Sequence, residues 1–341
     1  MKVYIRSAGS ISPQHSLDTD AFFQTRIEAT ENFFKSQEPD YDRFVDNKMI
    51  RRMSRIVKMG VAAAMTCLQN AEVENPGAIL TATAYGCLED SSAFLRRMIE
   101  FEETMLSPTA FIQSTHNTVG AQIALLLKCH HYNNTIVHRA FSFENALTES
   151  ILLLQEAIDP VLVGAIDEIT DDRHAILSRF GLYKRNEKSS GNIAGEGAAF
   201  FLLDKEPGNH PMAELKDLRT LYHPESMEAV RESLQDFLNE NRITIDKIGL
   251  ILTSHTGNAR QDEQDNQLLD SVFRGKPWFP FKSLCGDYPT ASGFALWLAA
   301  LLLKEQRRPA WMGALQFPLG NILIHHHSGN THHSFFLIQA V

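Results

Sequence analysis

The chain has 341 residues, enough for one large domain or two fused halves, and its hydrophobic content of 44% is ordinary for a protein with a substantial core. It contains 32 Lys and Arg against 41 Asp and Glu, so its formal charge is −9. A general nucleic-acid-binding role is therefore not expected, because neutralising phosphates requires a concentrated basic face.

Cysteine spacing and hydropathy indicate the compartment. The four cysteines lie far apart and form no CxxC pair, so we expect reduced, buried thiols. The N-terminus enters a strand without the zones of a signal peptide, which predicts a cytoplasmic protein. The most apolar stretch, residues 294–303, is about half of the roughly twenty residues that a membrane helix needs. We expect a core helix there and no membrane insertion.

Strand-like runs rich in β-branched or aliphatic residues recur along the first part of the chain, with helical patterns between most of them. Strands are expected at 3–7, 78–84, 135–138, 161–166 and 198–204. Helices are expected at 51–71, 118–127 and 145–157. This alternation predicts an α/β unit.

A loop containing two prolines and a glycine, residues 205–211, precedes a second series of elements. Strands are expected at 213–222, 248–254, 278–281, 321–327 and 334–339. Helices are expected at 227–240, 262–273 and 292–306. Because the second series echoes the first, we expect an N-terminal half at 1–206 and a C-terminal half at 212–341 that together form one unit.

Several motifs resemble successive landmarks of β-ketoacyl synthases of the thiolase superfamily, and they occur in that family's order. In the first half these are the opening strand and loop, a basic lead-in to a long helix, an interface stretch and a glycine-rich hairpin, at 5–13, 50–55, 107–117 and 195–204. In the second half they are a His-Gly-Thr-like loop and a Lys-Ser-rich segment, at 254–258 and 282–293. The resemblance implies a thiolase-like layered α-β-α-β-α fold, in which two similar halves contain mixed five-stranded sheets and the second half is truncated.

The turn between the strand at 135–138 and the next helix is where this family carries its catalytic cysteine. Such a turn exposes one side chain at the start of a helix, where backbone N–H groups and the helix dipole favour a thiolate or a developing oxyanion. The resemblance places the cysteine position at Ala140, or after a shift of one residue at Phe141. Neither side chain can be acylated.

The resemblance also implies that the family's two active-site histidines are absent. The first would stand at Asp287, and the segment that ordinarily supplies the second is missing after residue 306. Condensation needs a thiolate and two imidazoles. The chain therefore resembles the chain-length factors, as in aryl-polyene and flexirubin-type pigment pathways. These noncatalytic subunits, in a family of acyltransferases, pair with an active ketosynthase and use no cofactor.

The resemblance also assigns site residues and a second partner. Four side chains are expected to gate the partner's acyl tunnel, or to line an interface or core without touching substrate: Phe111, Gln113, Ser114 and Thr115. The remnant of the pocket is expected to contain Phe141, Ser142, His255 and Lys282. Asp287 is expected either to keep acid or base chemistry or, more simply, to be a solvated loop carboxylate or to pair with Lys282. Basic pairs at 51–52, 184–185 and 307–308 are candidates for attracting an acyl carrier protein, or are simply solvated.

Two alternative functions remain open. One is an active ketosynthase or acyltransferase that uses Ser142 or Cys285 as an unconventional nucleophile. Against it stand the simpler roles of a helix N-cap for Ser142 and a buried small side chain for Cys285. The other alternative is a homodimeric scaffold or binding protein outside lipid metabolism.

The histidines near the C-terminus, at 325–327 and 332–333, are the kind of side chain that binds transition metals. On a strand, however, alternate residues face opposite sides, so only His325 and His327 would share a face. A functional metal site is therefore not expected.

Overall fold

The computed structural model describes residues 1–29, 32–184 and 191–341. The strands of the first half are β1 (Tyr4–Ile11), β2 (Ala78–Ala82), β3 (Tyr132–Ile136), β4 (Val161–Asp167) and β5 (Gly197–Asp204). Those of the second half are β6 (Ala213–Tyr222), β7 (Leu250–Thr253), β8 (Trp278–Pro280), β9 (Asn321–Ser328) and β10 (His332–Gln339). The helices are α1 (Thr19–Gln24), α2 (Asn47–Ile50), α3 (Arg55–Asn70), α4 (Leu88–Glu100), α5 (Pro108–Gln113), α6 (Thr118–Leu127), α7 (Ser142–Gln155), α8 (Asp171–Arg179), α9 (Met227–Glu240), α10 (Ala259–Ser271), α11 (Lys282–Cys285) and α12 (Ser292–Glu305).

The strands follow one hydrogen-bonded order, β3-β2-β4-β5-β1-β6-β10-β9-β7-β8. The two halves have the same strand order. Counted outward from the junction of β1 and β6, the order in each half is its first, fifth, fourth, second and third strand. In each half the three outer strands are parallel and the inner ones antiparallel. The halves meet where β1 and β6 pair at Tyr4–Glu214 and Ile5–Ala213. The predicted pair of similar, mixed five-stranded halves is confirmed, and the two are joined edge to edge.

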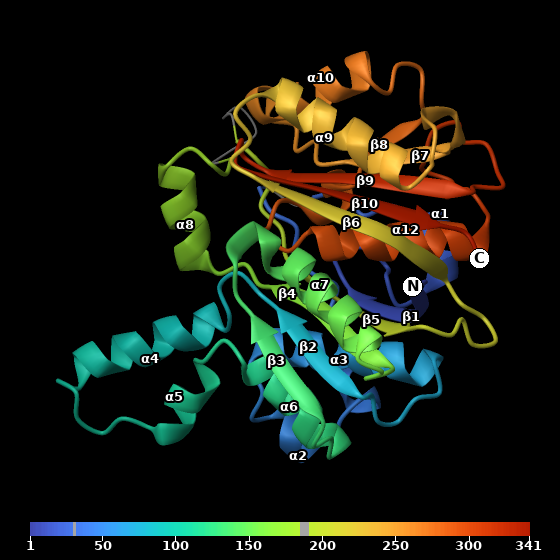
Figure 1. Cartoon of the computed structure of the whole chain (residues 1–341). Helices are drawn as coiled ribbons and strands as arrows, with labels where there is room; N and C mark the ends of the chain where they lie inside the picture. Colours follow the sequence, from blue (N-terminus) through green and yellow to red (C-terminus); the bar gives the residue numbers. More distant parts are fainter. Residues whose placement is uncertain (30–31, 185–190) are drawn as a thin grey trace.

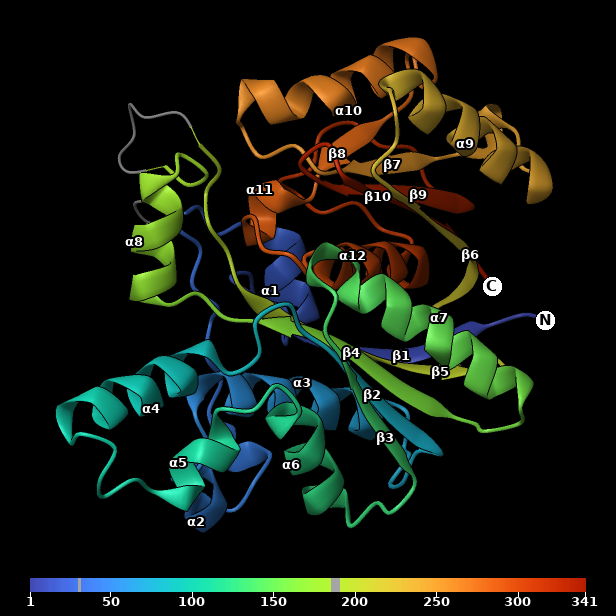
Figure 2. The same cartoon turned by 60° about the vertical axis from the view of Figure 1, so that its left-hand side comes forward.

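The helices form three layers separated by the two halves of the sheet (Figure 1, Figure 2). Helices α3 and α6 cover the outer face of the first half, and α9 and α10 cover the outer face of the second. Helices α7 and α12 lie between the halves, in the largest hydrophobic core. The expected α-β-α-β-α layering is therefore confirmed.

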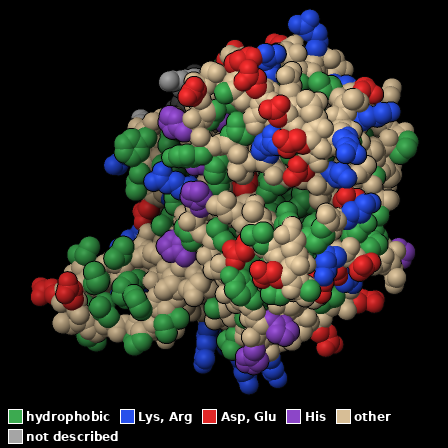
Figure 3. Space-filling model, in the orientation of Figure 1, with side chains coloured by type: hydrophobic (Ala, Val, Ile, Leu, Met, Phe, Trp, Pro, Cys, Tyr) green, Lys and Arg blue, Asp and Glu red, His purple; other side chains and the backbone are tan. Residues whose placement is uncertain are grey.

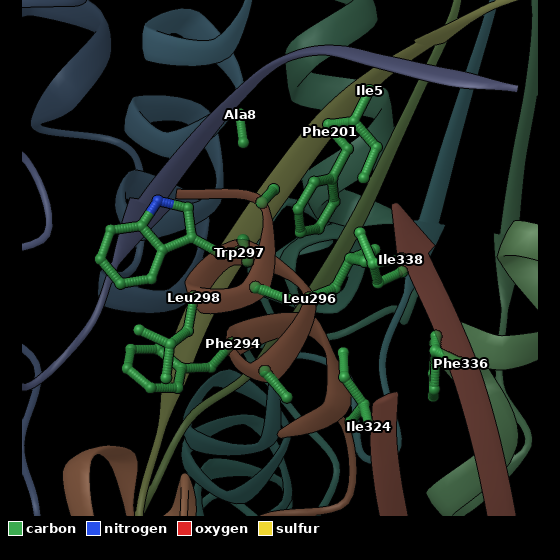
Figure 4. Close-up of a cluster of buried hydrophobic side chains, with 14 of the residues drawn as sticks. Ile5, Ala8, Phe201, Phe294, Leu296, Trp297, Leu298, Ile324, Phe336 and Ile338 are labelled. Carbon is green, nitrogen blue, oxygen red and sulfur yellow. The ribbon is translucent and has the colours of Figure 1, made fainter. Parts of the chain in front are cut away.

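Helix α12 is apolar around its whole circumference, as is typical of a helix that contacts protein on every side. Every residue from Ser292 to Leu303 is buried. The ring of Trp297 packs against Phe22 at a centroid distance of 5.0 Å and against Phe294 at 5.4 Å. Figure 4 shows Trp297 and Phe294 in one cluster with strand residues of both halves. The expected core helix is confirmed. Within the described part of the chain, no helix is long and apolar enough to cross a membrane.

Six of the described helices were missed by the sequence patterns: α1, α2, α4, α5, α8 and α11. Helix α4 buries none of its residues, so its apolar positions are not explained by a core within this chain. Strand β3 begins at Tyr132, three residues before its predicted start. The prediction missed this start because two asparagines follow Tyr132, and asparagine is a poor strand former. Helix α7 begins at Ser142 rather than at residue 145.

A buried carboxylate holds α10 against the β9–β10 hairpin. Asp265 accepts hydrogen bonds from His325 Nδ1 at 2.7 Å and His327 Nε2 at 3.2 Å, and His255 Nδ1 lies 3.3 Å away. Burial alone would raise the pKa of Asp265, but the imidazoles hold it far below its usual range. The ring of His333 stacks on His325 at 5.4 Å, and burial lowers the pKa of His333 to about 2.

We expect the substitution His333→Phe to make the free energy of unfolding depend less steeply on pH below about pH 6.5. The unfolded chain protonates this side chain near its ordinary pKa of 6.5, whereas the buried imidazole stays neutral until about pH 2. Its contribution is complete above about pH 6.5 and falls by about 1.4 kcal/mol per pH unit below it. Urea unfolding at several pH values measures this slope. The same slope in His333→Phe as in the exposed-site control His15→Gln would contradict the expectation.

A second prediction concerns the contact between β1 and α3. A Cβ at Gly9 would lie 2.2 Å from the Ala63 carbonyl oxygen and 2.8 Å from the Cys67 nitrogen. Gly9→Ala should therefore lower the free energy of unfolding by about 1–3 kcal/mol. Gly313→Ala is the matched control, since its Cβ would meet open space, and should stay within about 0.5 kcal/mol. Equal unfolding midpoints in urea for the two variants would refute the close-packing argument.

Candidate functional site

The turn after β3 has the form of a nucleophile elbow. Strand β3 ends at Ile136, a short 3-10 helix covers Arg139–Phe141, and α7 follows at once. Arg139 has φ of +51°, in the left-handed region that non-glycine residues adopt rarely, so the turn is tight. At its tip Ala140 is 3% exposed and presents only a methyl group. The strand-turn-helix backbone is present, and an alanine stands at the position predicted for the cysteine.

Of the two side chains considered as substitute nucleophiles, Ser142 is hydrogen-bonded to the backbone and Cys285 is buried. Ser142 Oγ accepts a hydrogen bond from the backbone N–H of His138 and donates one to the carbonyl of Arg139, each at 2.8 Å. The N-cap role considered for Ser142 is wrong, because Ser142 is the first residue of α7 and its hydroxyl closes the turn instead. Cys285 is fully buried, and burial raises the pKa of its thiol far above the usual value. Little thiolate is therefore available at neutral pH.

Asp287 is fixed by an ion pair and an amide. Lys282 Nζ donates to its Oδ1 at 2.8 Å, and Asn192 Nδ2 donates to its Oδ2 at 2.6 Å. Burial alone would raise the pKa of Asp287, but Lys282 and these hydrogen bonds lower it. Lys282 also donates to the carbonyl of His327 at 3.1 Å. Of the alternatives considered for Asp287, the structure shows the pairing with Lys282, and both carboxylate oxygens have partners.

A buried acid–imidazole pair lies close to the elbow. Glu144, in the first turn of α7, accepts hydrogen bonds from His326 Nδ1 at 3.2 Å and from Ser334 Oγ at 2.9 Å. Burial lowers the pKa of His326, so its ring is neutral. With Nδ1 as the donor, Nε2 is an acceptor, and none of the residues that the structure describes hydrogen-bonds to it. Sequence analysis missed this pair, although strand alternation does place His326 on the face opposite His325 and His327.

A cavity of about 240 Å³ lies between α8, the loop after α11 and the β9–β10 turn. Its wall includes Tyr85, Arg173, Tyr183, Asn192, Lys282, Asp287, Tyr288 and His326. A second cavity of about 370 Å³ contains His255 and Trp278, and it shares the Lys282–Asp287 ion pair with the first. The ion pair therefore lies on the boundary between two separate hollows.

The four residues expected in the pocket remnant are not gathered in one place. Lys282 lines both cavities, whereas His255 lines only the second, where its ring stacks on Trp278 at 4.8 Å. Phe141 and Ser142 line neither of these two cavities. Phe141 instead packs against His332, with ring centroids 4.7 Å apart. The first cavity's other polar residues, above all Arg173 and His326, come from segments distant in sequence.

Residues 88–115, here called the arm, extend away from the body of the molecule (Figure 1). The arm consists of α4, α5 and the loop that joins them. Figure 3 shows hydrophobic side chains gathered on it. Those with large exposure are Leu95, Ile99, Phe101, Met105, Phe111 and Ile112. A contiguous exposed apolar surface of this kind is characteristic of a protein–protein interface.

The four residues expected to gate a tunnel all lie on the arm. Phe111 is 58% exposed and packs only partly, against Phe94 at 5.7 Å. The other three are engaged within the chain. Gln113 donates to the carbonyl of a residue before α3, Ser114 Oγ to a carbonyl of α5 at 2.7 Å, and Thr115 Oγ1 to the amide oxygen of the next loop at 2.8 Å. The structure thus presents Phe111 outward and uses the polar residues to fix the end of the arm.

The outer edge of β3 lies on the same half of the molecule. Strand β3 ends the hydrogen-bonded order, so one side of its backbone has no strand beside it within the described chain. Tyr132 and Val137 at its two ends, and Leu125 on α6, are exposed. An open strand edge with exposed apolar neighbours can pair with another chain.

Two residue clusters noted in the sequence have ordinary structural partners. His325 and His327 do share a face, and their nitrogens bind Asp265. In the described ranges, no group of three or more ligating side chains could hold a metal ion. Of the basic pairs, Arg307 binds Asp20 at 2.6 Å, and Arg185 lies outside the described residues.

Comparison with known proteins agrees with the fold. Residues 26–183 match the family described as β-ketoacyl synthase, N-terminal domain. No curated protein sequence matches the chain. Among solved structures, the ishigamide ketosynthase/chain length factor aligns with 100% of this chain and 99% of its own, at a TM-score of 0.82 and 16% identity.

Two further structures align with the whole chain. The AntDE:AntF complex, a type II polyketide acyl-carrier protein with its ketosynthase, covers 100% of this chain and 99% of its own at a TM-score of 0.77 and 13% identity. The ketosynthase ApeO with its chain length factor ApeC, from Xenorhabdus doucetiae, covers 100% of this chain and 98% of its own. Its TM-score is 0.76 and its sequence identity is 14%. Likeness at this level of identity establishes the fold and leaves the reaction open. The expected resemblance is confirmed for the fold: the chain has the thiolase-like fold of the ketosynthase structures that it matches, and its residues 26–183 match the N-terminal domain family of the β-ketoacyl synthases.

Proposed function

We propose that the chain is a noncatalytic, chain-length-factor-like subunit. It pairs with an active β-ketoacyl synthase and shapes that enzyme's acyl tunnel in type II fatty-acid or polyketide synthesis, with a polyene pigment as the product. The single observation that carries the proposal is the elbow with Ala140 at its tip. An alanine can position neighbouring atoms, but it cannot form the thioester through which a ketosynthase works.

The arm and the edge of β3 supply the surface for the partner. Six exposed apolar side chains on the arm would be covered by a second subunit, which explains why α4 buries none of its residues in this chain. Two matched structures are described as a ketosynthase with a chain length factor. We therefore take a catalytic ketosynthase as the partner, and a second copy of this chain as the alternative.

The expected gating residues fit a steric role in the partner's tunnel. The carbonyl of Phe111 accepts a hydrogen bond from Ser114 Oγ, and its side chain packs on Phe94 on one side and is 58% exposed. A bulky side chain held in this way would limit how far an acyl chain can extend. Thr115 would act indirectly, by fixing the loop that ends the arm.

The same proposal includes an acyl carrier protein as a second partner and the cytoplasm as the compartment. The acyl chain would arrive on an acyl carrier protein, as in the matched complex of a carrier protein with its ketosynthase. We place the subunit in the cytoplasm, since all four cysteines are buried free thiols, as a reducing compartment maintains them. The halves at 1–206 and 212–341 would act together as one unit.

The first test addresses catalysis. After incubation with an excess of acetyl or malonyl thioester, intact-mass spectrometry should find no acyl adduct on the chain, because Ser142 is held by two backbone groups and Cys285 is buried as a thiol. An adduct that disappears in Ser142→Ala or in Cys285→Ala would establish the alternative of an unconventional enzyme. The variant that abolishes the adduct would identify the nucleophile.

The second test addresses assembly. Co-expression with a catalytic ketosynthase of type II synthesis from the same organism should give a one-to-one complex. The double substitution Phe111→Asp with Ile112→Asp should weaken the complex at least about tenfold, because it places two charges in an apolar contact. Leu17→Asp is the control, an exposed leucine outside the arm. Light scattering that finds only a dimer of this chain, with or without the ketosynthase, would favour the scaffold alternative.

A further inference from the structure

The elbow carries an exposed arginine in a strained backbone conformation. Among the described residues, ten that are not glycine have a positive φ, and eight of these lie within five residues after the end of a helix, where that conformation is common. The other two, Arg139 and His223, follow the strands β3 and β6. Both are exposed. A strained residue persists only where its surroundings fix it, and such residues gather at sites of function.

The backbone around Arg139 is fixed by two kinds of hydrogen bond. Its carbonyl accepts from Ser142 Oγ at 2.8 Å, and the same hydroxyl oxygen accepts from the N–H of His138 at 2.8 Å. The N–H of Phe141 donates to the carbonyl of His138 at 3.0 Å. The turn therefore keeps Arg139 in an exposed position before any partner binds.

The preceding residue supplies a second donor. Asn145 Nδ2 donates to His138 Nδ1 at 2.7 Å, so the ring proton of His138 is on Nε2. His138 is exposed, and no residue in the described part of the chain bonds to its Nε2. Burial lowers the pKa of His332, and charge on His138 and on Arg139 lowers it further. Both donors therefore lie near the His332 ring.

An aromatic cluster forms the base of this surface. Phe141 is buried, and its ring centroid lies 4.7 Å from that of His332 and 6.0 Å from that of His138. His332 also contacts Tyr222, with centroids 5.1 Å apart, and Tyr222 is 69% exposed. Exposed arginine and tyrosine side chains over a packed base are the kind of residues that contribute most to protein–protein binding.

Arg139 has no acidic partner within the described ranges of the chain, since none of their ion pairs includes it. The two carboxylates of α7 are engaged or enclosed. Glu144 is fully buried, so its carboxylate is not at this surface. Glu149 accepts hydrogen bonds from Tyr132 and Asn134. The donors at the elbow are thus available to an acceptor from another molecule.

We propose that Arg139 and His138 bind a carboxylate side chain of the partner subunit. The inference rests on the proposed function and names the chemistry that the partner presents at the elbow. The position supports it, because Arg139 lies three residues beyond the end of β3, whose outer edge belongs to the proposed interface, and Val137 between them is exposed. An apolar group here would leave the guanidinium desolvated and unpaired, whereas a carboxylate accepts from both donors.

The affinity of the complex tests the charge. A dilution series of the complex with a catalytic ketosynthase of type II synthesis from the same organism, followed by analytical ultracentrifugation, gives the Kd. Arg139→Gln should weaken the complex at least about tenfold, as expected for loss of a charge-assisted hydrogen bond at an interface. Arg242→Gln is the matched control and should change nothing, because Arg242 is also an exposed arginine with a positive φ, of +54°, but follows α9.

Arg139→Gly separates charge from backbone strain. Glycine adopts a positive φ without steric cost, so this variant should unfold at no lower urea concentration than Arg139→Gln. It should nevertheless bind the ketosynthase as weakly as Arg139→Gln does. Equal affinity of the wild-type chain and either folded variant would refute the carboxylate contact.

A cross-link identifies the acid. In Arg139→Lys an amine replaces the guanidinium, and a water-soluble carbodiimide joins an amine to a carboxylate within reach, with loss of water. Peptide mass spectrometry should find residue 139 joined to an Asp or Glu of the ketosynthase, and the control Arg242→Lys should give no such product at residue 242. Cross-links from residue 139 only to a second copy of this chain would overturn the assignment of the carboxylate to the ketosynthase.

The outcomes distinguish this inference from the proposed function. If the wild-type chain forms no one-to-one complex with the ketosynthase, the proposed pairing fails and this contact fails with it. If the wild-type complex forms and Arg139→Gln does not weaken it, the proposed pairing stands and the contact alone is refuted.

Discussion

The site depends on two helices packed between the halves of the sheet. Because α12 is buried from Ser292 to Leu303, the two half-sheets must lie on both sides of it. The position of Gly293 shows how close this packing is, since a Cβ there would lie 2.6 Å from that of Ala165. Helix α7 lies in the same layer, and Glu144 in its first turn reaches His326 on β9. The elbow of the first half and the cavity residues of the second are brought together by this one layer.

Much of the fold could be predicted from the sequence, and the reasons are local. Buried strands such as β4 and β5 consist of continuous apolar residues, and α12 is uniformly hydrophobic, so composition alone indicates them. The missed helices α4 and α5 have apolar residues that face outward, where no pattern within one chain explains them. The division at residues 206 and 212 stays a prediction.

The candidate site was less accessible to sequence reasoning, because its contacts join distant segments. Asn192 binds Asp287 across 95 positions, and Glu144 meets His326 across 182. Local spacing cannot indicate such pairs. Lys282 and Asp287 are only five positions apart, and their pairing was expected. Residues placed by resemblance, such as Phe141 and His255, have defined positions in the structure, but their roles stay predictions.

The open edge of β3 has a consequence for how this protein is made. Within the described chain no strand pairs with the outer edge of β3, and the same half carries the exposed apolar arm. Both features expose groups that promote self-association into insoluble material. In the cell, the chain would be protected only while a companion covers those groups. Matched synthesis of the two polypeptides would then determine how much intact protein accumulates, and a surplus of this one would be removed by chaperones and proteases.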